Sequence, residues 1–332
     1  MTIRRKAVRL VAVATAGLLA LTACSATGGK QKETAAAVGG GGAVADTERF
    51  TIAMVTHEAP GDSFWDKVRK GAETAAAKDN IELRYAADPT AAGESTLIQN
   101  AVDSKVDGLA VTLLQPDAMK GAVGAAVDAG IPVVAFNTGI SQYKDLGAMM
   151  YFGSDEDVAG KAVGARIAEA GAQHPLCVIQ EQGSVALEAR CAGVLAEAPG
   201  TENIQVDGKD IPSVTSTIAA KLQQDPSIDY VVTLGAPIAM AALQSVDQAS
   251  SDAKVVTFDL NADVATKIKD GTIPFAVDQQ PFLQGYLAVD SLWLYLTNRN
   301  DIGGGLPVLT GPSFVDSTNI DAIAEFAANN TR

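Results

Sequence analysis

The sequence is poor in aromatic residues, in histidine and in the motifs that hold nucleotides. Aromatic residues make up 5% of it, and His57 and His174 are its only histidines, so imidazoles for a catalytic triad or a zinc site are scarce. No G-x-x-x-x-G-K-[ST] segment, no G-x-G-x-x-G segment after the first expected strand and no G-x-S-x-G elbow are present. We therefore expect no cofactor and no catalysis.

A calcium site is also not expected. Asp259, Asn261 and Asp263 have the spacing that opens a calcium loop, but Val264 stands where the sharp turn of such a loop needs glycine. These residues are typical of a helix-capping cluster, so we predict no bound metal ion.

The N-terminus has the pattern of an export signal. Positive charges at Arg4, Arg5, Lys6 and Arg9 precede an apolar run at residues 10–21, which is too short to span a bilayer as a mature helix. The run ends in Leu-Thr-Ala-Cys, which resembles a bacterial lipobox. We therefore predict a lipoprotein signal peptide at residues 1–23, lipidation of Cys24, and a protein tethered to the extracytoplasmic face of the cell membrane by that lipid alone.

Residues 24–48 are rich in Gly, Ala, Gln, Lys and Thr, so we expect a flexible linker before the folded part begins. Removal of the signal peptide takes the formal net charge from −14 to −18, with 21 Lys and Arg against 39 Asp and Glu. That excess of negative charge argues against nucleic acid or anionic lipid as a partner.

Two cysteines remain after Cys24. Cys177 lies in a strand-like segment and Cys191 in the helix-like segment that follows, and an exported protein can form disulfides. A Cys177–Cys191 bridge and two buried free thiols are both compatible with this pattern.

Apolar runs of strand length alternate with helix-period segments from Phe50 to Asn300. Strands are expected at residues 50–56, 81–87, 108–114, 131–137, 149–153, 176–181, 203–208, 229–234, 254–259 and 273–279. Several of these runs are apolar on both faces, which is typical of parallel strands covered by helices on each side. The pattern predicts an α/β fold with two doubly wound parallel-sheet lobes.

In such sheets ligands bind at the carboxyl ends of the strands, beside helix N-termini. Polar neutral and acidic residues dominate at the expected strand ends, together with one arginine. They include Asp62, Ser63, Gln115, Asn137, Thr138, residues 181–190, Asp210, Gly235, Asp259 and Gln279.

Six segments in order resemble the type I periplasmic sugar-binding proteins, typified by ribose-binding protein, from about Thr51 to the end of the chain. They are IAMVTHEAPGDSFWDKVRKGAE, IPVVAFN, YFGSDEDVAGKAVG, LEARCAGV, KVVTFDLNAD and FAVDQQPFLQG. The resemblance implies a ligand between two lobes joined by a three-strand hinge, with closure on binding. It implies an N-terminal lobe at residues 49–153 and 280–306, and a C-terminal lobe at residues 154–279 and 307–332.

The resemblance also implies roles for individual residues. Phe64 and Trp65 would sandwich the apolar face of a sugar ring, Arg190 would donate to ring and hydroxyl oxygens, and Asn137, Asp259 and Gln279 would bind further hydroxyls. Ribose-type members carry Asp-Arg where this chain has Asn137 and Thr138, and an asparagine is usual at Gly235. These departures favour a polyol that is bulkier than ribose or differently substituted.

Some candidates have alternative interpretations. Arg190 could form a surface bridge with Glu181 or Glu188, Asp259 could cap a helix, and Gln279 could be a hinge residue. Helix geometry rotates Trp65 about 100° from Phe64, toward charged Arg69, which favours Trp65 as the stacking ring and Phe64 as a residue shared with the core.

Together these features predict a monomeric substrate-binding lipoprotein that captures a small neutral sugar or polyol and delivers it to an ABC permease. A sensor that hands its liganded form to a receptor remains an alternative, since the sequence cannot separate sensing from transport. A secreted glycosidase that uses two of Asp62, Asp210, Asp259 and Asp278 is a further, less favoured one.

Overall fold

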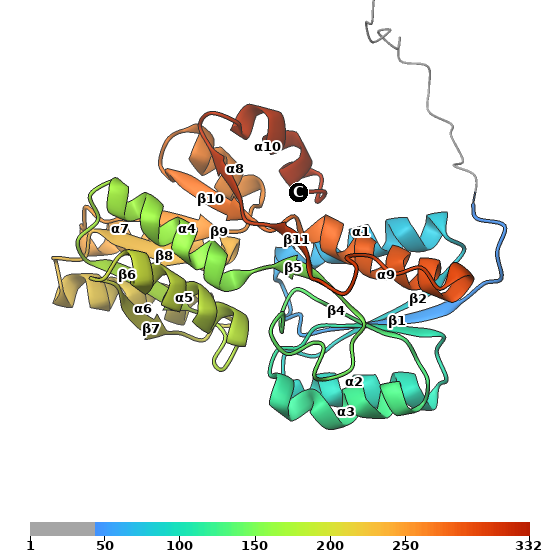
Figure 1. The fold of residues 1–332 in the computed structure, drawn as a ribbon. Coiled ribbons are helices and arrows are strands. Elements are labelled where there is room, and N and C mark those ends of the chain that lie inside the picture. Colours follow the sequence, from blue (N-terminus) through green and yellow to red (C-terminus); the bar gives the residue numbers. More distant parts are fainter. Residues whose placement is uncertain (1–43) are drawn as a thin grey trace, which may run out of the picture. The chain divides into compact units, whose positions relative to one another are not determined.

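The computed structural model describes residues 44–332, which form two lobes, each built on a six-stranded sheet with helices on both faces (Figure 1). The expected signal peptide at residues 1–23, the lipidation site Cys24 and most of the expected linker lie outside the described residues. Within residues 44–332, no helix is both long enough and apolar enough to cross a membrane.

The first lobe has the strand order β11-β5-β4-β3-β1-β2, with all pairs parallel. Its strands are β1 (Thr51–Thr56), β2 (Glu82–Ala87), β3 (Gly108–Val111), β4 (Val133–Phe136), β5 (Met150–Ser154) and β11 (Val308–Gly311). Its helices are α1 (Ser63–Lys78), α2 (Ala91–Asp103), α3 (Pro116–Asp128) and α9 (Pro281–Asn298).

Alternate residues of β1 pack into different layers of this lobe. Ile52 and Met54 join the apolar cluster of α1 and α9, whereas Ala53 and Val55 join that of α2 and α3. Because successive strand side chains point to opposite faces, a central strand buried on both sides must be apolar throughout. The two helix layers lie on opposite faces of the sheet (Figure 1).

The second lobe has the order β12-β10-β9-β8-β6-β7, parallel except for β12. Its strands are β6 (Pro175–Ile179), β7 (Glu202–Gln205), β8 (Tyr230–Thr233), β9 (Lys254–Phe258), β10 (Phe275–Asp278) and β12 (Ser313–Asp316). Its helices are α4 (Glu156–Glu169), α5 (Val185–Glu197), α6 (Ile211–Gln224), α7 (Ala236–Ala249), α8 (Ala262–Lys269) and α10 (Ile320–Ala328). Helices α4 and α5 pack on one face of the sheet and the others on the opposite face.

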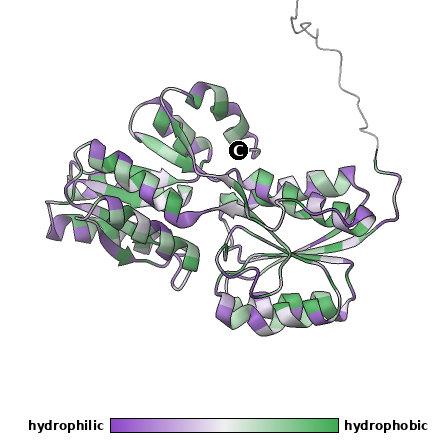
Figure 2. Ribbon diagram, in the orientation of Figure 1, coloured by the Kyte–Doolittle hydropathy of each residue, from purple (hydrophilic) through white to green (hydrophobic). Residues whose placement is uncertain are grey.

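The predicted fold class is confirmed: the chain forms two doubly wound α/β lobes, and the ten expected strands correspond to β1 to β10. The helices show apolar and polar stripes, as expected for a layer between a sheet and solvent (Figure 2). Strands β11 and β12 and helix α10 were not predicted. The two strands are short and flank Pro312, and a proline normally argues against a strand at that point of a sequence.

The chain passes between the sheets three times: after β5, after β10 and between β11 and β12. The third passage falls at Pro312. Because β11 pairs with β5, residues 308–311 belong to the first sheet, although the resemblance placed everything from residue 307 in the C-terminal lobe.

Two glycines allow α1 and α9 to pack in close contact. A Cβ on Gly71 would lie 1.9 Å from the carbonyl oxygen of Phe282, and one on Gly285 would lie 2.0 Å from that of Val68. Only glycine fits at such a backbone approach. This contact fixes α1 against α9, and the N-terminus of α1 carries several of the predicted site residues.

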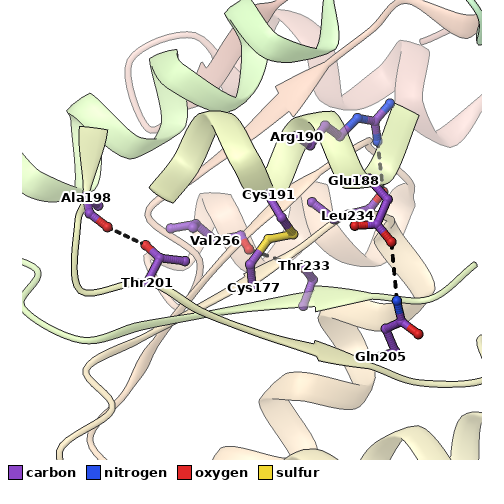
Figure 3. Close-up of a disulfide and its surroundings, with 10 residues drawn as sticks. All are labelled: Cys177, Glu188, Arg190, Cys191, Ala198, Thr201, Gln205, Thr233, Leu234 and Val256. Atoms are coloured by element: carbon purple, nitrogen blue, oxygen red, sulfur yellow. Dashed lines mark hydrogen bonds between the residues drawn. A yellow bond between two sulfur atoms is a disulfide. The ribbon is translucent and has the colours of Figure 1, made fainter. Parts of the chain in front are cut away.

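Cys177 and Cys191 form a disulfide that joins β6 to α5, with 5.9 Å between their Cα atoms (Figure 3). The bridge is buried in the apolar cluster of α4 and α5. It therefore anchors α5, the helix that carries Arg190, to the sheet beneath it.

Candidate functional site

The loops that follow the strands of both sheets enclose a cleft with two connected parts. The inner pocket has a volume of about 40 Å³ and the outer cleft one of about 1060 Å³. Asp62, Gln180 and Glu181 line both parts. One water molecule takes up about 30 Å³ of liquid, so in this conformation a ring-shaped ligand needs space from the outer cleft or a rearrangement of the inner pocket.

Both lobes contribute to the inner pocket. The first lobe supplies His57, Asp62, Phe64, Trp65, Asn137 and Thr138. The second supplies Gln180, Glu181, Ser184, Ala186, Leu187, Arg190, Leu234 and Asp259, and Gln279 follows β10 at a crossing between the sheets. Eight of the eleven predicted ligand residues are therefore among the residues that line the inner pocket, counting Asp62, Phe64, Trp65, Asn137, Thr138, Arg190, Asp259 and Gln279.

Phe64 and Trp65 form one aromatic wall. Their rings meet edge to face, with centroids 5.1 Å apart and planes at 80°, and Trp65 meets His57 in the same way at 4.7 Å. A sandwich needs two roughly parallel rings with space for a ligand between them, so the predicted sandwich by this pair is wrong for this conformation. The rings can offer a ligand one face or edge from one side only.

Phe64 is shared with the core as predicted, but Trp65 is buried in the same cluster, so core packing does not separate the two rings. Phe64 is 8% exposed and Trp65 is 2% exposed, and both belong to the apolar cluster of α1 and α9. Helix geometry alone places Trp65 toward Arg69, but the first turn of α1 is covered by its neighbours in the fold. Both rings pack in the core and also line the inner pocket.

Two predicted residues lie outside both parts of the cleft. Ser63 lines neither part of the cleft, and its carbonyl oxygen accepts a hydrogen bond from Lys67 Nζ at 3.0 Å. Asp210 is exposed, lines neither part, and caps α6 by accepting from Ser213 N at 3.1 Å. Because β7 is the edge strand of its sheet, the chain that follows it reaches only the rim of the cleft, where residues 207–209 lie.

Asp62 combines capping with a place in the cleft. Its Oδ1 accepts from Phe64 N at 2.9 Å at the start of α1. Burial raises the pKa of Asp62 from its ordinary value, while that hydrogen bond and nearby Lys67 act in the opposite direction. The second oxygen has no hydrogen bond to another described residue.

Asn137 and Thr138 follow β4 as predicted. Asn137 has a φ of 65°, a conformation that asparagine tolerates better than most residues, and its Nδ2 donates to Gln284 Oε1 at 3.2 Å. Thr138 Oγ1 donates to the carbonyl oxygen of Leu113 at 2.6 Å. These bonds orient both residues at the carboxyl end of β4 in the first sheet.

Arg190 is buried and forms an ion pair that the sequence did not reveal. Its Nε and Nη2 donate to the two oxygens of Glu156 at 2.5 and 3.1 Å, and Nη1 donates to the carbonyl oxygen of Leu234 at 3.2 Å. Both side chains are 4% exposed. The alternative of a surface bridge to Glu181 or Glu188 is therefore wrong, and Glu188 instead accepts from Gln205 (Figure 3).

Asp259 and Gln279 form a second buried pair. Gln279 Nε2 donates to Asp259 Oδ1 at 2.6 Å, and Asp259 adopts a φ of 68° at the end of β9. Asn261 caps α8, so the capping role considered for Asp259 belongs to its neighbour. Burial raises the pKa of Asp259 to about 7, although Arg190 and the bond from Gln279 favour the ionised form.

Gly235 lies at the start of α7 and lines the outer cleft. A Cβ at this position would lie 3.2 Å from Nε2 of Gln180, so the missing side chain leaves room for that amide. The extra space predicted at Gly235 is therefore taken up in part by Gln180.

Several polar residues of the pocket were not singled out as ligand residues. His57, Gln180, Glu181 and Ser184 line it, and Lys67 is buried where the charges of Asp259 and Asp62 act on its ammonium group. Burial raises the pKa of Glu181 to about 7, and the carboxylate of Asp62 adds to that effect. Gln180, Glu181 and Ser184 follow β6, so the strand-end rule could have identified them individually.

One cluster outside the cleft has metal-ligand chemistry but is already neutralised. Among residues 44–332, His174, Glu202 and Asp225 bring ligand atoms within 4.8 Å of one another. Lys221 Nζ lies 2.6 Å from Glu202 Oε2 and 3.9 Å from Asp225 Oδ2, so an ammonium group already pairs with both carboxylates of this cluster.

Comparison with known proteins identifies related chains. Residues 52–300 match the model of the periplasmic binding protein domain. A xylose/arabinose-binding protein of Sulfolobus acidocaldarius is 26% identical over 67% of this chain and 60% of its own length. A ribose import binding protein of Bacillus subtilis is 25% identical over 74% of this chain and 81% of its own length.

A solved structure is more similar. A carbohydrate transporter from Acidothermus cellulolyticus 11B, in complex with myo-inositol, is 57% identical, covers 86% of this chain and 100% of its own, and superposes with a TM-score of 0.85. These matches agree with the family that the six segments resemble. The chain therefore belongs to the periplasmic binding protein family.

Proposed function

We propose that the protein is the solute-binding component of an ABC importer and that it captures a neutral cyclitol, with myo-inositol as the first candidate. The ligand would bind where the inner pocket meets the outer cleft, and the two lobes would close on it by a hinge at the three passages between the sheets. Delivery to a permease and attachment to the membrane through Cys24 are part of the same proposal.

The proposal rests chiefly on the excess of hydrogen-bond acceptors in the pocket. The Oε1 atoms of Gln180 and Gln279 are buried with no hydrogen-bond partner within residues 44–332. Three carboxyl groups, those of Asp62, Glu181 and Asp259, line the same pocket. Because a buried acceptor without a donor costs about 1–3 kcal/mol, a ligand that supplies donors gains binding energy here.

Part of the donor capacity of the pocket is already used within the protein. Three donors of Arg190 are engaged by Glu156 and Leu234, and Asn137 Nδ2 by Gln284. A cyclitol carries a hydroxyl on each ring carbon, and each hydroxyl can donate. A pyranose contains a ring oxygen that can only accept, so it satisfies fewer acceptors for the same ring size.

The net charge of the pocket supports a neutral ligand over an acidic one. Glu156 balances the charge of Arg190, burial lowers the pKa of His57 to about 3 and keeps it neutral, and the three carboxyl groups face the same space. A carboxylated sugar would add a further negative charge among them. The related transporter from Acidothermus cellulolyticus, with myo-inositol bound, supports the cyclitol among neutral ligands.

A thermal-shift and calorimetric panel tests this proposal. It compares myo-inositol with D-ribose, D-glucose, D-xylose and D-glucuronate on the mature protein. A ligand at 100 times its dissociation constant stabilises the fold by about 2.7 kcal/mol. We expect the largest shift with myo-inositol and none with D-glucuronate, and tighter binding of D-ribose than of myo-inositol would overturn the cyclitol assignment.

The related proteins argue against a secreted glycosidase, but they do not argue against a sensor protein. They are named as binding or import proteins, which agrees with the expectation that the chain is not an enzyme and disfavours a glycosidase. No residue of the cleft separates transport from sensing, so the choice of permease over receptor rests on the family.

A further inference from the structure

A row of polar side chains runs from α2 to the inner pocket and includes none of the eleven predicted ligand residues. Thr112 Oγ1 donates to Glu94 Oε1 and accepts from His57 N at 3.2 Å. His57 Nδ1 lies 2.8 Å from Thr112 Oγ1, and His57 Nε2 lies 3.9 Å from Glu181 Oε2. Glu94 and Thr112 are 0% exposed and His57 is 5% exposed.

The single hydroxyl hydrogen of Thr112 determines where the imidazole hydrogen sits. When Thr112 donates to Glu94, it has no second hydrogen for Nδ1, and the short Nδ1 contact then requires that Nδ1 carry the hydrogen. Burial raises the pKa of Glu94 well above its ordinary value, and a protonated Glu94 that donated to Thr112 would reverse this order, so the tautomer is part of the inference that the NMR experiment below tests. His57 is neutral because burial lowers its pKa to about 3. When Thr112 donates to Glu94, Nε2 is a bare acceptor directed toward the cleft.

Two acceptors from different lobes then face each other. His57 follows β1 in the first lobe, Glu181 follows β6 in the second, and the atoms 3.9 Å apart cannot donate to each other when Glu181 is ionised. While Glu181 is ionised, such a pair is stable only when donors lie between or beside the two atoms. The pKa of Glu181 is about 7, so the ionised form, and with it the need for a ligand donor, becomes predominant as pH rises above 7. Asp62, which belongs to the same lobe as His57, and Asp259, which belongs to the same lobe as Glu181, add further acceptors when they are ionised.

We propose that His57 Nε2 and the Glu181 carboxylate form a subsite that spans the two lobes and binds two neighbouring hydroxyl groups of a ring polyol. Each hydroxyl donates to one acceptor, so the ligand replaces the missing donors and draws the lobes together. Glu94 is a positioning residue, which acts through Thr112 to keep Nε2 free of hydrogen. This subsite rests on the proposed function, because it assumes a polyhydroxylated ligand in the cleft.

The tautomer of His57 can be measured without any ligand. Nitrogen-15 NMR distinguishes a bare ring nitrogen from a protonated one, and His174 is the only other histidine, so a His174→Gln variant assigns the signals. We expect Nδ1 protonated and Nε2 bare at neutral pH. A ligand-free protein with Nε2 protonated would overturn the inference.

Substitutions along the row test how the tautomer is set. Thr112→Val removes the acceptor at Nδ1, and Glu94→Met frees the Thr112 hydrogen for Nδ1, so both should move the imidazole hydrogen to Nε2. Thr112→Ser keeps the hydroxyl and should leave the tautomer unchanged. Circular dichroism checks that each variant folds, and an unchanged tautomer in a folded Glu94→Met protein would refute the role of Glu94.

Ligand binding tests the subsite itself, with myo-inositol as the probe. Glu181→Ala should weaken binding about tenfold or more, since it removes a charge-assisted hydrogen bond. Glu188→Ala, which changes an exposed glutamate of α5 outside the pocket, should leave affinity unchanged. Myo-inositol should also shift the Nε2 resonance of His57 and leave those of His174 in place.

The outcomes separate the two proposals. If myo-inositol stabilises the protein but leaves His57 Nε2 and the Glu181→Ala affinity unaffected, the subsite is refuted and the proposed function stands. If myo-inositol does not bind the wild-type protein, the proposed ligand is refuted, and the tautomer measured without ligand still decides whether Nε2 is the acceptor that the subsite requires.

Discussion

Neutralising Glu156 should destabilise the protein far more than neutralising the aspartate beside it. Glu156 holds the buried guanidinium of Arg190 through two hydrogen bonds, and each side chain is 4% exposed. Removing one partner of a buried ion pair leaves an uncompensated charge and costs about 3–5 kcal/mol. Glu156→Gln keeps the shape of the side chain and removes only its charge.

A matched control lies on the same helix. Asp157 pairs with Lys161 at 2.6 Å, but these side chains are 53% and 46% exposed, so solvent screens the pair. Exposed pairs contribute about 0–1 kcal/mol. Urea denaturation followed by circular dichroism should therefore give a loss of about 3 kcal/mol or more for Glu156→Gln and of less than about 1 kcal/mol for Asp157→Asn.

A double replacement separates stability from binding. Glu156→Leu with Arg190→Met removes both charges, and apolar replacements of a buried pair often restore stability. The double variant should unfold near the wild-type midpoint yet bind myo-inositol poorly, because Arg190 lines the pocket. Equal losses for Glu156→Gln and Asp157→Asn would refute the reasoning about the buried pair.

The remaining predictions concern the disulfide, the aromatic wall and pH. Replacing Cys177 and Cys191 with serine should lower the free energy of unfolding by about 3 kcal/mol, since the bridge closes a short loop with a sequence separation of 14; urea midpoints with and without reductant check this, and identical midpoints would contradict it. Trp65→Ala should cost about 3–5 kcal/mol because the ring is 2% exposed, and should weaken myo-inositol binding at least tenfold by calorimetry, whereas Trp65→Phe should recover part of both. An unchanged affinity would show that the indole of Trp65 does not contact the ligand. Burial raises the pKa of Asp259 and of Glu181 to about 7, above the values of about 4 in the unfolded chain, so folding takes up protons and stability should fall as pH rises through that window. Thermal unfolding followed from about pH 4 to about pH 7 should show stability decreasing as pH rises, and Asp259→Asn should make this decrease smaller. An increase in stability with pH over this range would contradict the raised pKa values.

Sequence patterns predicted the fold and the edge of the sheets at which the site lies, because both depend on local signals. The alternation of apolar strands and amphipathic helices places β1 to β10, and the polar residues after those strands include Asn137, Asp259 and Gln279. Parallel strands end at one edge of a sheet, so this rule needs no tertiary contact.

The errors have a common origin in contacts between distant parts of the chain. Arg190 meets Glu156 across 34 positions of sequence, and the rings at the start of α1 are covered by His57 and by the cluster of α9. Asp210 follows the edge strand β7, and its position at the rim depends on the order of strands in the sheet. Neither helix geometry nor strand-end position carries that information.

Isothermal titration of the mature protein with myo-inositol, compared with D-ribose, tests the central claim most directly. The acceptor-rich pocket predicts 1:1 binding of myo-inositol that is at least tenfold tighter than that of D-ribose. Tighter binding of D-ribose, or no measurable heat with myo-inositol at concentrations that saturate a micromolar site, would contradict the account.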